Sequence, residues 1–157
     1  MAKFRSFYSS YRDKLFGYLV RITGDYYLSC DIMQESFTRY LKRYGKREQS
    51  GPLLFKIARN ALLDYQRKSI RNVRLEDDGD YAQNDPEHDL MIRDEYRRVL
   101  SAMQQLGETE REALSLVVSS NMSYREIAEI TNTSEQNVKV RVHRARVKLK
   151  QIIEKGR

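Results

Sequence analysis

Residues 122–150 read MSYREIAEITNTSEQNVKVRVHRARVKLK, and this stretch decides the fold. Ser123, followed three residues later by Glu126, has the pattern of a capping box, which predicts that a short helix begins here. The polar run at residues 131–133 predicts a tight turn, and Ser134 predicts the N-cap of a longer, basic helix. A short helix, a three-residue turn and a longer helix are typical of a helix-turn-helix.

The longer helix has two different faces. Its apolar residues recur every three or four positions, so this face is expected to pack on its own domain. They are Val138, Val142, Ala145, Leu149 and Ile152. The opposite face is rich in cations and amides, and such a helix fits the major groove of B-DNA, where its first turns reach base edges and flanking arginines reach phosphates. The residues predicted to contact duplex DNA are Ser134, Gln136, Lys139, Val140, Arg141, His143, Arg144 and Arg146.

The alternative interpretation of this helix is a solvated basic face at the end of a chain. It accounts for the charge, but it does not explain why the charge coincides with two helix caps and a tight turn. We therefore favour DNA binding.

The rest of the chain predicts an all-α protein of two small helical domains. Residues 1–68 have helical periodicity that is interrupted at Gly24-Asp25 and in the loop Gly45–Pro52. Residues 90–157 form the second domain, in which Thr109–Glu112 has the pattern of another capping box.

Residues 69–89 are predicted to be a flexible linker, because the apolar spacing stops and Asp, Gly, Asn and Pro dominate. Seven acidic residues and no Lys or Arg lie between Leu75 and Asp89. Two basic domains therefore flank an acidic connection.

The composition limits the class of function. The 157-residue chain has a net charge of +7, which indicates a polyanionic partner such as nucleic acid. Cys30 is the only cysteine, so no internal disulfide is expected and the chain has the composition of a cytoplasmic protein. We find no catalytic dyad, zinc-ligand cluster, phosphate-binding glycine loop or membrane-spanning run, so we expect no enzyme activity, no metal, no cofactor and no membrane insertion.

Two further stretches have a weaker pattern. Residues 53–68 place aromatic, basic and amide side chains on one predicted helix, a combination that suits single-stranded DNA because bases stack on aromatic rings and phosphates pair with cations. Residues 31–38 pair an apolar inner face with an exposed acidic and amide face. Taken alone, the first pattern also fits a core helix and the second a solvated surface.

Together, these stretches resemble conserved regions of the sigma-70 family of RNA polymerase sigma factors. Asp-Ile-Met-Gln-Glu-Ser-Phe at residues 31–37 resembles the region 2 helix that usually reads Asp-Leu-Val-Gln-Glu-Thr-Phe. Residues 53–67 are similar to the promoter-melting segment, usually Trp-Leu-Tyr-Arg-Ile-Ala-Arg-Asn followed by Asp-Tyr and basic residues. Residues 106–149 resemble region 4, whose last helix commonly reads Ser-Glu-Gly-Thr-Val-Lys-Ser-Arg-Leu-His-Arg-Ala-Arg. The order of the three stretches and the presence of only two domains resemble the extracytoplasmic-function group.

The resemblance implies a function and assigns residues to it. Residues 1–68 would bind core RNA polymerase and the melted minus-10 strand, and residues 90–157 would bind the duplex minus-35 element through the helix described above. The polymerase-binding residues would be Asp31, Gln34, Glu35 and Thr38. The minus-10 residues would be Lys46, Arg47, Lys56, Arg59, Asn60, Tyr65, Arg67 and Lys68. The resemblance also implies an anti-sigma factor as a partner.

The chain departs from the family pattern at two positions. Leu53 occupies the place of the usual tryptophan, and Val140 replaces a common Ser or Thr in the recognition helix, so the base preference is expected to differ. Three alternatives compete with this interpretation. A stand-alone helix-turn-helix regulator leaves residues 31–67 unexplained, and a nuclease would require clustered carboxylates on structured elements. The basic recognition helix argues against the third, an inert helical adaptor. The sequence gives neither the promoter nor the inducing signal.

Overall fold

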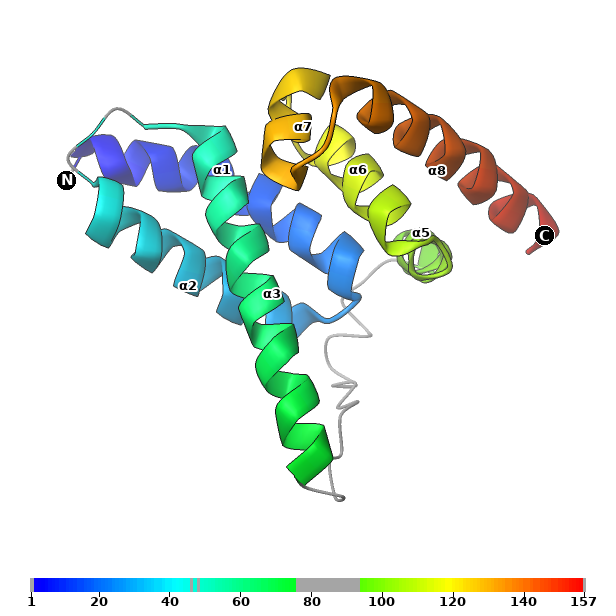
Figure 1. Ribbon diagram of the computed structural model, residues 1–157, viewed down its shortest axis with the longest axis horizontal. Helices are drawn as coiled ribbons and strands as arrows, with labels where there is room; N and C mark the ends of the chain where they lie inside the picture. Colours follow the sequence, from blue (N-terminus) through cyan, green and yellow to red (C-terminus); the bar gives the residue numbers. More distant parts are fainter. Residues whose placement is uncertain (1, 46, 48, 76–93, 157) are drawn as a thin grey trace.

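The computed structural model describes residues 2–45, 47, 49–75 and 94–156, and within these ranges every regular element is a helix (Figure 1). The N-terminal unit consists of α1 (Ala2–Thr23), α2 (Tyr26–Tyr44) and α3 (Gly51–Leu75). The C-terminal unit consists of α5 (Asp94–Gln104), α6 (Glu108–Ser119), α7 (Tyr124–Thr131) and α8 (Glu135–Lys155). The predicted all-α class is confirmed. No helix within the described ranges combines the length and apolar character needed to cross a membrane.

The break between α1 and α2 follows from two residues. Gly24 has φ +66°, a left-handed conformation that glycine adopts without steric cost, and its amide still donates to the carbonyl of Val20. Asp25 then caps α2, because its carboxylate accepts a hydrogen bond of 3.0 Å from the amide of Leu28. The predicted interruption at Gly24-Asp25 is therefore confirmed.

The start of α3 is held by side chains of the N-terminal unit. The Ser50 amide donates to the buried hydroxyl of Tyr40 at 2.8 Å, and the Ser50 hydroxyl accepts from the amide of Leu53. Residue 51 is a glycine because a Cβ there would overlap the ring of Tyr11. Pro52 lies in the first turn, where its missing amide proton costs no hydrogen bond.

The helix α3 is longer than the sequence pattern predicts. We expected the linker to begin at residue 69, but α3 continues to Leu75, so the first seven residues of that segment are helical. Apolar periodicity stops before the helix does, because the end of α3 extends beyond the rest of the unit (Figure 1) and residues 70–72 are exposed there. The acidic residues from Glu76 to Asp89 lie outside the described residues.

The two caps predicted for the helix-turn-helix are confirmed. Ser123 and Glu126 form a reciprocal capping box, with each side chain bonded to the backbone amide of the other residue. Asn132 ends α7 with φ 54° and ψ 48°, a left-handed conformation that asparagine tolerates better than most residues. Ser134 caps α8 by accepting a hydrogen bond of 3.1 Å from the amide of Asn137.

The capping box predicted at Thr109–Glu112 is wrong. The N-cap of α6 is Gly107, which makes no side-chain capping hydrogen bond. The helix thus begins two residues earlier than the pattern suggests, and Glu112 is free to make a long-range contact.

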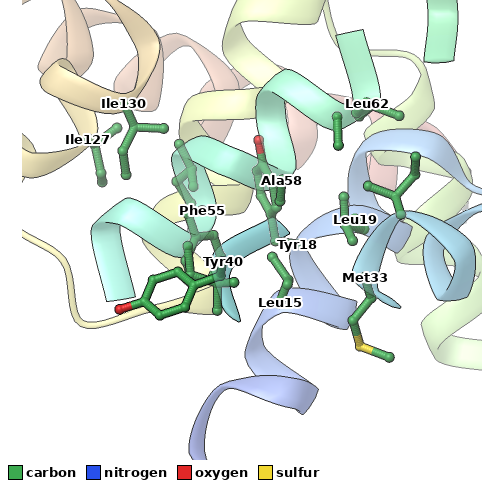
Figure 2. Close-up of a cluster of buried hydrophobic side chains, with 14 of the residues drawn as sticks. Leu15, Tyr18, Leu19, Met33, Tyr40, Phe55, Ala58, Leu62, Ile127 and Ile130 are labelled. Atoms are coloured by element: carbon green, nitrogen blue, oxygen red, sulfur yellow. The ribbon is translucent and has the colours of Figure 1, made fainter. Parts of the chain in front are cut away.

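The two units share one hydrophobic core. Phe55 and Ala58 of α3 are fully buried, and the cluster around them continues from α1 and α2 into Ile127 and Ile130 of α7 (Figure 2). A second, smaller cluster lies within the C-terminal unit between α5, α6 and α8. Since a helical bundle of this size buries only about 60% of its unfolded surface, packing the units together increases the apolar area that each removes from water.

Polar contacts surround the shared core. Arg111 of α6 donates to the carbonyls of Met103, Gln104 and Leu106 at the end of α5 and also to Ile22 at the end of α1. The side-chain amide of Gln104 donates to the same end of α1. The last carbonyls of a helix have no partner within the helix, so these two side chains of the C-terminal unit complete the end of α1.

Candidate nucleic-acid interface

The recognition helix α8 presents the face that the sequence predicts. Val138, Val142 and Ala145 are buried against the C-terminal unit. On the opposite side Gln136, Lys139, His143 and Arg144 are exposed, and Val140 is half-buried between them. Because the residues of this stripe are spaced three or four apart, they line one side of the helix.

Three other predicted residues lie at the margins of this face. Ser134 is exposed, and its oxygen serves as the helix cap, which leaves its O–H group free to donate. Arg141 is half-buried near the apolar side. Arg146 lines an apolar groove between α5, α6 and α8, together with Arg21 of α1, so its position suits a protein or phosphate contact better than a base contact.

The exposed acidic and amide strip of α2 is also placed as expected. Asp31, Gln34, Glu35 and Thr38 are all exposed. Glu35 bonds to Arg39 one turn later at 2.8 Å, and this hydrogen bond raises the pKa of the Arg39 guanidinium above its ordinary value. Gln34 contacts the hydroxyl of Tyr8.

The residues predicted for the minus-10 strand do not share one face of α3. Lys56, Asn60 and Arg67 are exposed and lie within about 40° of one another at 100° per residue. Tyr65 lies roughly 160° away on the other side of the helix. Arg47 is exposed in the loop before α3, with its guanidinium 5.7 Å from the ring centre of Tyr44, and Lys46 lies outside the described residues.

Tyr65 and Lys68 instead line a groove between α2 and α3, which they share with Asp31 and Glu35. Asp64 also lines this groove and bonds to Arg39 at 3.3 Å across it. The structure therefore groups two of the predicted minus-10 residues with the predicted polymerase-binding strip.

Arg59 is directed to the C-terminal unit. Its Nε donates to Oε2 of Glu112 on α6 at 2.8 Å, and the two side chains are only 21% and 18% exposed. The hydroxyl of Tyr18 on α1 donates to the same oxygen at 3.5 Å. Sequence reasoning missed Glu112 as a contact residue, because its spacing from Thr109 suggested a local cap.

Tyr18 is fully buried beside this ion pair. Burial, together with the nearby carboxylate of Glu112, raises the pKa of the Tyr18 hydroxyl well above its ordinary value of 10.0. Tyr18 therefore stays neutral and keeps its proton as a donor. Within the described residues, no three side chains of His, Cys, Asp or Glu lie close enough together to hold a metal ion.

Two family matches cover most of this architecture. Residues 7–72 match the family Sigma-70 region 2, and residues 96–149 match the family Sigma-70, region 4. The chain belongs to the sigma-70 family. The first match includes α2 and α3 up to Asn72, which the alternative of a stand-alone helix-turn-helix regulator left unexplained.

The relatives place it in the extracytoplasmic-function group. The chain is 35% identical over 157 residues to the ECF RNA polymerase sigma factor SigM of Bacillus subtilis (strain 168), an alignment that covers 95% of this chain and 94% of that protein. It is 30% identical to the ECF RNA polymerase sigma factor EcfG of Rhodopseudomonas palustris (strain TIE-1), covering 87% of this chain and 77% of that one. The RNA polymerase sigma-H factor of Pseudomonas aeruginosa is also 30% identical, with 87% and 78% covered.

A solved structure has the same fold throughout. The sigma factor RpoE, in its co-crystal structure with the anti-sigma factor NepR from Bartonella quintana, aligns with a TM-score of 0.79 over 100% of both chains at 21% identity. The family matches and the sigma-factor relatives, rather than this fold similarity, show that the protein is a sigma factor that directs RNA polymerase to initiate transcription.

The Tyr18 environment predicts an alkaline loss of stability. Above about pH 10 an unfolded tyrosine ionises, whereas Tyr18 in the folded protein does not. The raised pKa therefore costs stability as the pH rises, and the loss continues until the pH reaches the folded pKa. We expect Tyr18→Phe to flatten the decline in unfolding free energy measured by urea titration between about pH 8 and about pH 11. The other tyrosines are the same in both proteins, so an identical decline would show that Tyr18 is not the cause.

Proposed function

We propose that the sigma factor divides promoter recognition between its two units. The C-terminal unit binds the duplex minus-35 element through α8, and the N-terminal unit binds the melted minus-10 strand through α3. A separate groove between α2 and α3 docks on core RNA polymerase. The observation that carries this proposal is the exposed polar stripe of α8, which stands opposite its buried apolar stripe behind a capped first turn.

The minus-35 contact rests on the geometry of the first turns of α8. A recognition helix enters the major groove with its N-terminal residues nearest the bases. Gln136 and Lys139 supply donors for adenine or guanine edges, and Val140 offers an apolar contact for a thymine methyl group. Arg144 lies further along the same face and suits a base or a phosphate, while Arg141 at the margin suits a phosphate.

We expect Lys139→Ala or Arg144→Ala to weaken promoter binding by about 1–3 kcal/mol if the contact is a bidentate base contact. Binding to core polymerase should not change, because the substitution lies in the other unit. Lys155→Ala is the matched control, since it removes the same charge from the last turn of α8. Electrophoretic mobility shifts and polymerase pull-down measure the two effects. Equal losses of DNA and polymerase binding would contradict the assignment of these two functions to different units.

The minus-10 contact rests on the face of α3 that carries Lys56, Asn60 and Arg67, with Arg47 in the preceding loop. Cations along a helix follow the phosphates of a single strand, and the amide of Asn60 can bond to an unpaired base edge. Phe55 does not take part in stacking, because it is fully buried in the core.

We expect Asn60→Ala to slow open-complex formation more than it weakens the first binding step, since the base is available only after melting. Permanganate footprinting detects the unpaired thymines, and mobility shifts detect the first step. Gln66→Ala is the control, because Gln66 is also exposed on α3 but lies roughly 120° around the helix. Normal melting by Asn60→Ala would reject this assignment.

The polymerase contact rests on the groove between α2 and α3. Asp31, Glu35 and Asp64 give this groove an acidic character on a protein whose net charge is +7. Such a groove favours a basic partner surface and disfavours DNA phosphates. Tyr65 adds an aromatic side chain that is 45% exposed, which is typical of a residue covered on binding.

Charge reversal tests this surface. We expect Asp31→Lys and Glu35→Lys together to reduce core-polymerase binding by about tenfold or more, because like charges then face each other. Helical content should stay the same, since both side chains are exposed. The control is Asp13→Lys, an exposed charge reversal on α1 outside the groove. Unchanged pull-down by the double variant would show that the polymerase binds elsewhere.

We also propose an anti-sigma factor as a partner, and the cytoplasm as the place of action because core polymerase is there. The similar RpoE chain was solved together with the anti-sigma factor NepR. In this chain the apolar groove between α5, α6 and α8, lined by Val99, Met103, Leu114 and Leu149, is a suitable surface for an apolar helix of such a partner.

A further inference from the structure

We propose that Glu112 is a latch that holds the two units of the free sigma factor together and that keeps Arg59 away from DNA. The ion pair joins α3 to α6, so it exists only while the units are packed. The functional consequence rests on the strand-binding role proposed above for α3, whereas the latch itself is defined by the contact between the units.

The latch is positioned where opposite charges interact strongly. Both side chains are about four-fifths buried, so water and salt screen this pair less than an exposed one. The buried Tyr18 hydroxyl donates to the same carboxylate oxygen that Arg59 contacts. Removing the charge of Glu112 leaves the largely buried Arg59 guanidinium without its anion, which is costly in a closed interface.

Glu112 also competes chemically with nucleic acid. A guanidinium binds carboxylate and phosphate with the same donors, so a carboxylate bonded at 2.8 Å occupies Arg59 as a phosphate would. The exposed cations of the same helix, Lys56 and Arg67, have no such partner among the described residues. Arg59 is therefore the α3 cation that can bind a phosphate only after the two units separate.

The remaining contacts of the interface fit a closed state that can open. Besides the apolar packing of α1 on α6 and of α3 on α7, they include the bond from Arg21 of α1 to Ser119 of α6 at 2.6 Å and the bonds of Gln104 and Arg111 to the end of α1. Backbone carbonyls at a helix end are easily hydrated when exposed. The charge pair is thus the contact whose loss would leave a largely buried charge without a counter-charge.

Opening is measured without DNA, by energy transfer between dyes on the two units. Dyes are attached through Lys42→Cys on α2 and Lys155→Cys on α8, both exposed sites, in a Cys30→Ala background. We expect most molecules of the otherwise unchanged chain to be closed. For Glu112→Gln, which keeps the size of the side chain but loses its charge, we expect the equilibrium constant for opening to be about tenfold larger. Circular dichroism checks that helical content is retained.

The matched control is Glu110→Gln. Glu110 lies two residues away on α6 and bonds to Lys148 at 2.9 Å, but both partners belong to the C-terminal unit. This control makes the same change in net charge and breaks an ion pair without touching the interface. The same distribution of distances for Glu112→Gln and the unchanged chain, or equal opening by Glu110→Gln, would overturn the latch.

A single-stranded minus-10 oligonucleotide separates the latch from the proposed function. We expect Glu112→Gln to bind it several-fold more tightly, and Arg59→Gln to open equally without this gain. If both variants open but neither changes strand binding, the latch stands and the role of Arg59 in strand capture is wrong. If neither opens while Arg59→Gln weakens strand binding, the latch is wrong and the proposed function stands.

Discussion

The burial of the apolar stripe of α3 is the constraint on which the rest of the structure depends. Leu54, Phe55 and Ala58 are fully buried, and they lie in a cluster that includes side chains of α1, α2 and α7. A short bundle of three helices leaves part of such a stripe uncovered. With α7 against it, the first helix of the helix-turn-helix becomes part of the same core, and α8 is left with its polar face outward.

The helices, their caps and the outward face of α8 follow from the sequence because they depend on local physics. A cap needs a particular residue within three positions of another, so Ser123 and Ser134 can be recognised as caps from the sequence. A buried stripe repeats every three or four residues, so Val138 can be recognised as a core residue. The acidic and amide strip at Asp31, which we propose binds polymerase, is exposed for the same reason. Its neighbours Ile32 and Met33 are buried, and a helix turns 100° per residue.

The contacts between distant parts of the chain do not follow from local patterns. Glu112 has the spacing of a capping residue from Thr109, but α6 begins at Glu108 and the carboxylate bonds to Arg59, 53 residues away in sequence. Periodicity shows that α3 has an apolar side without showing that α6 lies beside it. For the same reason, placing Tyr65 with Asn60 in one binding set overlooks that they lie on opposite sides of α3.

The acidic side chains explain how a protein with a positive net charge keeps an acidic surface apart from its basic surfaces. Asp31, Glu35 and Asp64 surround one groove, and their field repels phosphate and favours a cationic protein surface. The exposed cations of α3 and α8 lie on other faces, where they attract phosphate. Glu112 differs from both groups because the cation that it neutralises, Arg59, belongs to the other unit. Where the units separate, that cation and the apolar side chains of α3 that face α7 become exposed together, so a partner that covers these apolar side chains also favours the release of Arg59. Under the proposed latch, binding of protein and of nucleic acid to the N-terminal unit would be coupled through one interface, with a reciprocity that linked equilibria require.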